Sequence, residues 1–177
     1  MRFVFLDTET TGFNRSRDNG EICDNHRIIE IGCIEMIDGE LTGRTFHKYL
    51  DPKIKIDPKA TKVHGLEDSF IKGKPSFKDI ASDFIRFISD AVIVIHNAPF
   101  DIAFIDKEFT MLPQKLRPSI TFHYIDTLVM ARERFPGMKN SLDALGSDLG
   151  ISTEKRRHRA LDDATLLAKV YSKLKFT

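Results

Sequence analysis

The sequence contains only two cysteines, Cys23 and Cys33, among 177 residues. Two thiols cannot form the disulfide framework of a small secreted domain, and a chain of this length folds without one, because it buries roughly 70% of its unfolded surface. The spacing of Cys23, His26 and Cys33 also matches no common zinc finger. We therefore expect a reduced, cytoplasmic protein without structural zinc.

Long apolar runs and an excess of charge are also missing. No stretch approaches the roughly 20 apolar residues that span a membrane, and the N-terminal segment reaches a carboxylate at Asp7, unlike a signal peptide. The 27 Lys and Arg residues nearly balance the 26 Asp and Glu residues, which gives a formal net charge of +1. This excludes a strongly basic, histone-like coat, so any nucleic-acid binding must be local. We expect no membrane association and, because no exposed apolar stripe stands out, a monomer when isolated.

The pattern of apolar residues predicts a single α/β domain over residues 1–177, without linkers or repeats. Strands are expected at 2–6, 28–37, 41–50, 91–95 and near 120–125. The first of these stops at Asp7, and the Asp38-Gly39 turn makes the next two a hairpin. Helices are expected at 76–88, from Pro99 onward, and at 126–134, 141–149 and 160–174. A hairpin group followed by alternating helices and strands predicts a mixed sheet with helices packed against it.

Two acids follow the first predicted strand, in the segment DTETTG at residues 7–12. Alternate residues of a strand face the same side, about 7 Å apart along the chain, so Asp7 and Glu9 point together. Such carboxylates repel each other unless a cation lies between them, and oxygen ligands suit Mg²⁺ or Mn²⁺ better than zinc. The pair is therefore either a metal site or a strand end with chance acids.

A third acid, Asp101, ends the segment HNAPFD at residues 96–101, in the first turn of a predicted helix. The helix dipole favours an acid at this position whatever its role. The carboxyl ends of strands are, however, where α/β sheets place their ligand sites. This segment alone leaves both interpretations open.

Two adjacent acids open the last predicted helix, in the segment HRALDDA at residues 158–164. On a helical wheel Asp163 lies in the middle of the apolar stripe, whereas Asp162 lies on the side of the lysines. A carboxylate that faces a core must be paired or bind a metal. We therefore predict that Asp163 is a ligand or a capping acid and that Asp162 is solvated.

His158 stands ahead of the same helix, where its ring can reach the pocket of Asp163. A histidine accepts a proton near neutral pH, which suits a general base. The other five histidines are expected to be mostly structural or exposed. Four basic residues around His158 form either a solvated face or a grip for phosphates: Lys155, Arg156, Arg157 and Arg159.

In order and context, DTETTG, HNAPFD and HRALDDA resemble the three motifs of the DEDDh family of 3′–5′ exonucleases. The likeness runs from Arg2 to about Tyr171 and includes IIEIG at 28–32, VHGL at 63–66 and SLDAL at 141–145. Within the family, the sequence looks most like the proofreading exonucleases of bacterial replicative DNA polymerases. Each motif alone is modest evidence, whereas the three together are specific.

The resemblance implies a ribonuclease H-like fold, an α/β architecture with a five-stranded mixed sheet flanked by helices. It implies that His158 is the general base and that two Mg²⁺ or Mn²⁺ ions are held by four acids: Asp7, Glu9, Asp101 and Asp163. It also places the substrate against Asp7, Glu9 and Asp163 and against His64 of the VHGL segment. The expected reaction releases nucleoside 5′-monophosphates from the 3′ end of DNA.

A frayed 3′ end needs little reading of base sequence, because a mismatched terminus has already lost part of its pairing. Aromatic side chains near the site can stack on the last bases. Phe13 and Phe100 are the candidates, and core packing is the stronger interpretation for Phe100.

The resemblance also implies partners, namely a polymerase catalytic subunit, a small accessory subunit and a sliding clamp. Family members that serve a replicative polymerase often carry a C-terminal tail for these contacts, whereas this sequence ends at Thr177. We expect either a catalytic fragment or a protein that holds its partners differently.

Two other functions fit the same motifs. An RNA-directed member, such as an oligoribonuclease or a tRNA-trimming nuclease, shares the cleavage chemistry. A module that only binds and stabilises a polymerase is the other alternative, and candidates at all five catalytic positions argue against it.

Overall fold

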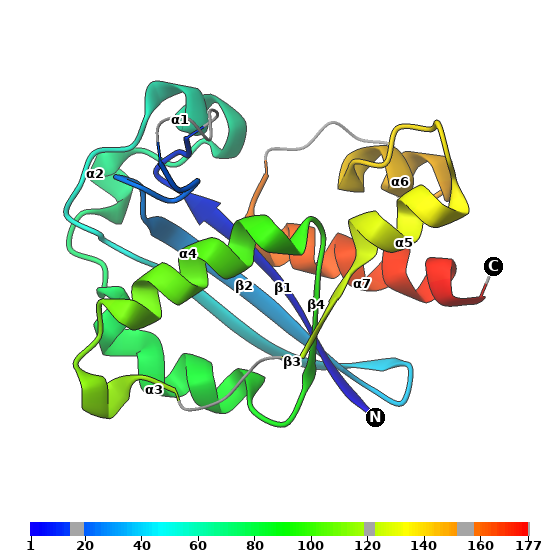
Figure 1. Ribbon diagram of the computed structural model, residues 1–177, viewed down its shortest axis with the longest axis horizontal. Coiled ribbons are helices and arrows are strands. Elements are labelled where there is room, and N and C mark those ends of the chain that lie inside the picture. Colours follow the sequence, from blue (N-terminus) through cyan, green and yellow to red (C-terminus); the bar gives the residue numbers. More distant parts are fainter. Residues whose placement is uncertain (15–19, 119–122, 152–157, 177) are drawn as a thin grey trace.

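The computed structural model describes residues 1–14, 20–118, 123–151 and 158–176. Within them, five strands form one mixed sheet in the order β3-β2-β1-β4-β5 (Figure 1). The strands are β1 Arg2–Thr10, β2 Ile28–Ile37, β3 Glu40–Tyr49, β4 Val92–Ile95 and β5 Tyr124–Asp126. β2 is antiparallel to β1 and β3, whereas β4 is parallel to β1 and β5. The five-stranded mixed sheet predicted from the sequence is confirmed.

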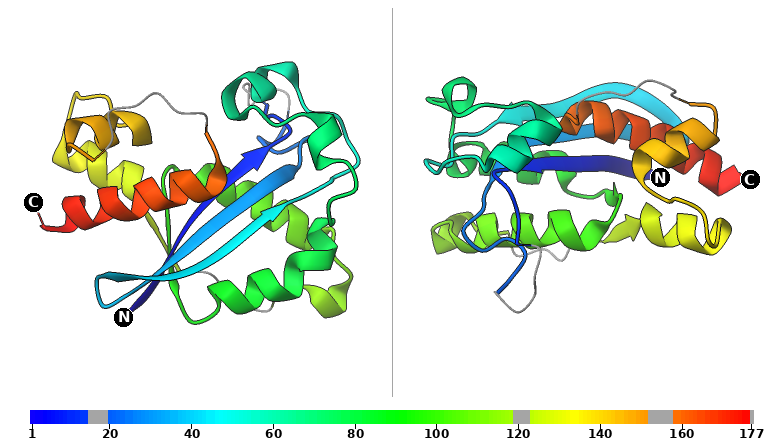
Figure 2. Two further views of the ribbon diagram at one scale, coloured as in Figure 1. Left: turned by 180° about the vertical axis from the view of Figure 1, so that it is seen from behind. Right: turned by 90° about the horizontal axis from the view of Figure 1, so that it is seen from above.

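Helices cover both faces of the sheet, as the view from above in Figure 2 shows. One face carries α3 and α4, and the other carries α5, α6 and α7. These five helices span Phe77–Ile88, Ala98–Thr110, Thr127–Arg134, Leu142–Asp148 and Ala160–Phe176. None of the helices in the described residues combines the length and apolar character that crossing a bilayer requires.

The side chains of β1 alternate between two apolar cores. Val4 and Leu6 join the cluster beneath α3 and α4, whereas Phe3 and Phe5 pack with α7 on the opposite face. Because both faces are covered, the strand reads as a continuous apolar run rather than as an alternating one. Both cysteines are buried free thiols.

The first strand is longer than the sequence predicts. We expected it to stop at Asp7, but β1 continues to Thr10, because residues 7–9 pair with residues 30–32 of β2. Pairing with a neighbouring strand thus extends β1 beyond its apolar part. Both acids of the DTETTG segment therefore lie on the strand itself.

Other boundaries also differ from the prediction. The last strand, expected near 120–125, runs from Tyr124 to Asp126, and residues 119–122 lie outside the described part of the chain. Three short elements were not predicted: α1 Pro58–His64, α2 Asp68–Ile71 and the 3-10 turn Gln114–Leu116. They are too short to show a helical apolar period. Figure 1 shows α1 beside the end of β1.

Candidate active site

Three of the predicted acids converge near the end of β1. Carboxylate oxygens of Asp7, Glu9 and Asp163 all lie within 4.8 Å of one another. Asp7 and Glu9 come from β1, and Asp163 comes from the first turn of α7. Strand spacing therefore turns both β1 acids toward the face that α7 covers. Three carboxylates this close fit hard divalent cations such as Mg²⁺ or Mn²⁺.

Gly32 lets α7 approach the sheet closely enough for this convergence. It pairs with Asp7 across the β1–β2 ladder. A Cβ atom at Gly32 would lie 2.2 Å from the carbonyl carbon of Ala160 and from the backbone nitrogen of Leu161. The first turn of α7 thus rests on the β2 backbone, and Asp163 reaches the β1 acids. A larger residue at Gly32, the glycine of the IIEIG segment, would collide with the backbone of α7.

Asp101 lies beside the three acids and is held by Thr8. Its Oδ1 accepts hydrogen bonds from the Thr8 backbone N–H at 3.0 Å and from the Thr8 hydroxyl at 2.7 Å. α4 follows β4, which is parallel to β1, so both carboxyl ends meet at one edge of the sheet. The charge of Asp101 contributes to the raised pKa of Asp7. Asp101 is therefore adjacent to the other three acids, but it is not part of the group whose carboxylate oxygens all lie within 4.8 Å of one another.

Asp126 holds the loop that precedes α4, the helix that carries Asp101. Its carboxylate accepts hydrogen bonds from the backbone N–H groups of Asn97 at 3.0 Å, Ala98 at 3.1 Å and Leu128 at 2.9 Å. The sequence predicted that a helix begins at Asp126, whereas this residue caps α5 and also binds the start of α4. One side chain thus joins the ends of β4 and β5, and Asn97 is held at φ 66°.

Burial raises the pKa values of three of the acids, Asp7, Glu9 and Asp101. Burial, followed by repulsion from Asp101, Asp163 and Glu9, holds the pKa of Asp7 well above its ordinary value. Burial and the charge of Asp163 raise the pKa of Glu9 to about 8. Burial also raises the pKa of Asp101 to about 7, against the hydrogen bonds from Thr8. Divalent cations would displace these protons at neutral pH.

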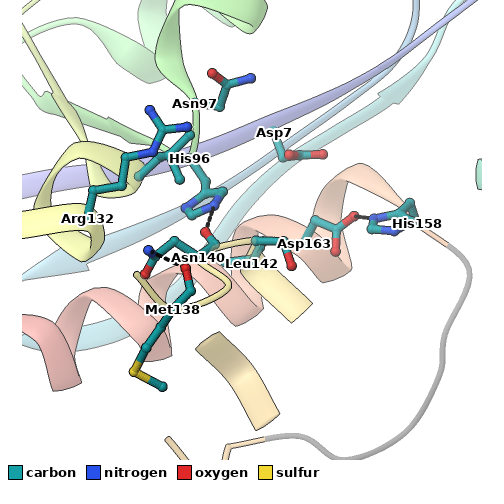
Figure 3. Close-up of a pocket in the computed structure, with 11 residues that line it drawn as sticks. Asp7, His96, Asn97, Arg132, Met138, Asn140, Leu142, His158 and Asp163 are labelled. Carbon is teal, nitrogen blue, oxygen red and sulfur yellow. Dashed lines mark hydrogen bonds and ion pairs between the residues drawn. The ribbon is translucent and has the colours of Figure 1, made fainter. Parts of the chain in front are cut away.

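His158 contacts two carboxylates. Its Nδ1 lies 3.0 Å from Asp163 Oδ2, and its Nε2 lies 3.4 Å from Asp143 Oδ2 (Figure 3 draws the first contact). The contact with Asp163 is the main cause of the raised pKa of His158. The imidazole therefore reaches the acids from ahead of α7, as the sequence predicted. Asp143, from the SLDAL segment, had no predicted role.

Arg159, one of the four basic residues around His158, has a different environment from either predicted one. Arg159 Nε donates to Glu30 at 3.1 Å, and its guanidinium also binds the Tyr49 hydroxyl. Glu30 is fully buried, and its other oxygen lies 2.7 Å from His47 Nε2. Arg159 is thus bound to the sheet, and residues 155–157 lie outside the described chain. The sequence signal for this network is Glu30, a carboxylate within the largely apolar strand β2.

His64 is buried at the end of α1, with 2% of its surface exposed. Its Nδ1 accepts a hydrogen bond from the Leu66 backbone N–H at 3.0 Å, so the ring proton of the neutral form lies on Nε2. Nε2 has no hydrogen-bond partner among the described residues. Burial lowers the pKa of His64 to about 4, against the opposing effect of the Thr10 backbone, so the ring is neutral and its Nε2–H is enclosed by the protein.

The two aromatic candidates contact each other. The ring centroids of Phe13 and Phe100 are 5.5 Å apart, with an edge-to-face orientation. Phe100 also packs on Phe104, which is fully buried, and this agrees with its predicted core packing. Phe13 is 45% exposed.

A pocket of about 600 Å³ lies against two of the four acids (Figure 3). One side is formed by Asp7, Asp163 and His158. The other lining residues come from the loop between β4 and α4, from α5, and from the segment that leads into α6 together with its first residue: His96, Asn97, Leu128, Arg132, Met138, Asn140, Ser141 and Leu142. Such a volume admits one or two nucleotide-sized groups.

Relatives of known identity match nearly the whole chain. The family described as Exonuclease (RNase_T) matches residues 4–171. The DNA polymerase III subunit epsilon of Buchnera aphidicola subsp. Schizaphis graminum is 49% identical over 173 residues, which cover 97% of this chain and 73% of that protein. The corresponding subunit of Escherichia coli K12 is 46% identical over 172 residues, which cover 96% and 70%.

Solved structures share the fold. The nuclease domain of 3′hExo, a DEDDh family member bound to rAMP, has a TM-score of 0.78 at 16% identity and covers 99% of this chain and 92% of that domain. Exonuclease I without ligand has a TM-score of 0.77 at 18% identity and covers 99% and 42%. These likenesses confirm the ribonuclease H-like fold. The chain belongs to the RNase_T exonuclease family, and its close relatives among the DNA polymerase III epsilon subunits make it a 3′–5′ exonuclease.

Proposed function

We propose that this exonuclease proofreads DNA for a bacterial DNA polymerase III, removing nucleoside 5′-monophosphates from the 3′ end. The observation that carries the proposal is the convergence of Asp7, Glu9 and Asp163, with His158 bound to Asp163. The sequence likeness to named epsilon subunits supports DNA as the substrate.

Four acids would hold two Mg²⁺ or Mn²⁺ ions in this site: Asp7, Glu9, Asp101 and Asp163. Carboxylate oxygens are the ligands that these cations prefer. When bound, the pair of ions stabilises negative charge on the attacking water and on the departing 3′ oxygen. The three convergent acids would also face the phosphate of the terminal nucleotide, and His64 would lie against the same nucleotide.

His158 would act as the general base. Its Nδ1 is directed at Asp163, which fixes the ring. Its Nε2 lies 3.4 Å from Asp143 Oδ2 and would accept a proton from an attacking water that takes the place of this contact. The water oxygen bonds to the phosphorus of the last nucleotide, and the bond from that phosphorus to the 3′ oxygen of the preceding nucleotide breaks. The products are a nucleoside 5′-monophosphate and a strand shortened by one residue.

Residues 1–177 would form a single exonuclease domain that works within a larger assembly. Because the relatives are polymerase III subunits by name, we assign the catalytic subunit of that polymerase as a partner. A small accessory subunit and the sliding clamp are further proposed partners, and the isolated chain would be a cytoplasmic monomer.

The test uses a 5′-labelled single-stranded DNA oligomer and matched duplexes with and without a 3′ mismatch, each with Mg²⁺, Mn²⁺ or EDTA. We expect a ladder that recedes from the 3′ end, disappears with EDTA and forms faster on the mismatched duplex. Faster cleavage of RNA oligomers of the same sequence would favour the RNA-directed alternative. Absence of cleavage with either metal would leave the polymerase-binding module as the better interpretation.

A further inference from the structure

We propose that Arg132 and Asn97 form a subsite for the sugar-phosphate backbone of the DNA strand next to the cleaved bond. The inference rests on the proposed function, because it extends the substrate site of the same exonuclease. The pocket that contains Asp7 and Asp163 continues to these two side chains. Figure 3 shows the guanidinium end of Arg132 and the Asn97 amide together on the side of the pocket away from His158.

Both side chains are available for a ligand. Arg132 is exposed and forms no ion pair with any carboxylate in the described part of the chain. The carboxylate of Asp126, the N-cap of the same helix, already accepts hydrogen bonds from three backbone N–H groups. The Asn97 side chain is exposed and does not cap α4. A permanently charged guanidinium and an amide therefore face the pocket without a protein partner among the described residues.

The positive charge of Arg132 would balance negative charge on the phosphates of a bound strand. In the proposed site, four carboxylates balance two divalent cations, so each further phosphate of a bound strand adds uncompensated negative charge. A guanidinium binds a phosphate through two parallel hydrogen bonds and keeps its charge at any working pH. The subsite therefore selects a polyanionic strand over an isolated mononucleotide.

The wall beyond Arg132 is apolar. Leu128, Met138 and Leu142 line the pocket, and Met138 is 53% exposed. Flexible aliphatic and thioether groups contact any base without reading its hydrogen-bonding edge. This combination fits an unpaired strand of any sequence, which is the form of a melted 3′ terminus.

His96 keeps this wall in place. Its Nδ1 lies 2.9 Å from the Thr127 hydroxyl, and its Nε2 lies 2.9 Å from the Asn140 carbonyl oxygen. The Asn140 side chain in turn donates to the carbonyl oxygens of Phe135 and Met138 at 3.3 and 3.0 Å. The segment between α5 and α6 is thus fixed to β4 at the edge of the pocket.

Arg132→Gln tests the subsite, with Arg134→Gln as the matched control. Arg134 is exposed on the same helix, and two residues along a helix turn a side chain by about 200°, away from the pocket. Each protein is assayed on a single-stranded DNA oligomer and on thymidine 5′-(4-nitrophenyl) phosphate, which has a scissile phosphodiester but no neighbouring nucleotide.

We expect Arg132→Gln to raise KM for the oligomer about tenfold, the scale of one lost charge-assisted contact, with kcat unchanged. The slope of log kcat/KM against log salt should fall by about 0.7, as for one lost phosphate contact to a single strand. The nitrophenyl ester should be hydrolysed at the wild-type rate, and Arg134→Gln should match the wild type on both substrates.

Equal losses on both substrates, or an unchanged KM for the oligomer, would overturn the subsite. Binding of a fluorescent oligomer in Ca²⁺, followed by anisotropy, tests it independently of cleavage. A tenfold weaker Kd for Arg132→Gln supports the subsite, and an unchanged Kd rejects it. Failure of the wild-type protein to degrade DNA would reject the proposed function, and the binding result would still decide the subsite.

Discussion

At the scale of single residues, two neighbouring aspartates on α7 differ only in the direction they face. Asp163 is 2% exposed and points at the β1 acids, whereas Asp162 is exposed to solvent. Asp163→Asn should nearly abolish turnover and weaken Mg²⁺ binding, because the change removes one charge from the ligand cluster. Asp162→Asn, the matched control, should retain activity. Steady-state rates and calorimetric Mg²⁺ titration check both, and normal turnover in Asp163→Asn would remove this residue from the metal site.

A substitution at His158 can separate the hydrolysis step from DNA binding. Its imidazole is partly exposed and bound to Asp163, so removal leaves the acids and the fold in place. His158→Ala should slow single-turnover hydrolysis about 100-fold or more, the usual scale for a general base, while the Kd for DNA stays near the wild-type value. If the rate and the affinity fall together, His158 is a substrate contact instead.

Spacing rules predicted part of this site and missed the rest for physical reasons. Alternation along β1 placed Asp7 and Glu9 on one face, and the helical wheel separated Asp163 from Asp162, because both follow from local backbone geometry. The position of Arg132 at the same pocket depends on how α5 packs beside β4. No local period encodes such a contact between distant segments.

At the scale of elements, Gly32 sets how close α7 lies to the sheet. Gly32→Ala would place a methyl group 2.2 Å from the α7 backbone, which must then shift. The free energy of unfolding should fall by about 1–3 kcal/mol or more, the cost of overpacking, and Mg²⁺-dependent turnover should be lost as Asp163 moves away. Thermal unfolding and activity assays measure both effects.

Gly146→Ala is the control for this substitution. The nearest atoms to a Cβ at Gly146 are the ends of the Leu166 side chain at 3.1 and 3.3 Å, which can turn aside, and alanine favours the helix. This variant should stay within about 1 kcal/mol of the wild type. Equal behaviour of the two variants would show that the close approach of α7 has no special role.

The sequence predicted the bounds of a helix or strand correctly where a single apolar pattern runs through the whole element. β2 and α3 matched the sequence prediction because each is long and strongly patterned. β1 ran past its predicted end because β2 supplies hydrogen-bond partners to polar residues. The helices α1 and α2, of 7 and 4 residues, depend on caps and tertiary packing rather than on periodicity.

At the scale of the whole molecule, the acidic cluster couples stability to pH and to metal. The folded protein holds protons on Glu9, with a pKa of about 8, and on Asp101, with a pKa of about 7. Unfolding restores the ordinary pKa near 4, so these protons are released. Stability without metal must therefore fall as the pH rises through 7 to 8. The raised pKa of His158 acts in the same direction.

Buried His64 has the opposite effect, because its pKa is lowered to about 4 and it gains stability as the pH rises toward the ordinary histidine value. That gain in stability is nearly complete by about pH 7, so between about pH 7 and 8.5 the acids determine how stability changes with pH.

In EDTA, we expect the melting temperature to fall by a few degrees over this interval, since each group held protonated for one pH unit costs about 1.4 kcal/mol. Mg²⁺ replaces the protons, so it should stabilise the protein more at pH 8.5 than at pH 7, and Glu9→Gln should flatten the profile in EDTA. A melting temperature that is independent of pH in EDTA would mean that the acids are ionised in the folded state without metal.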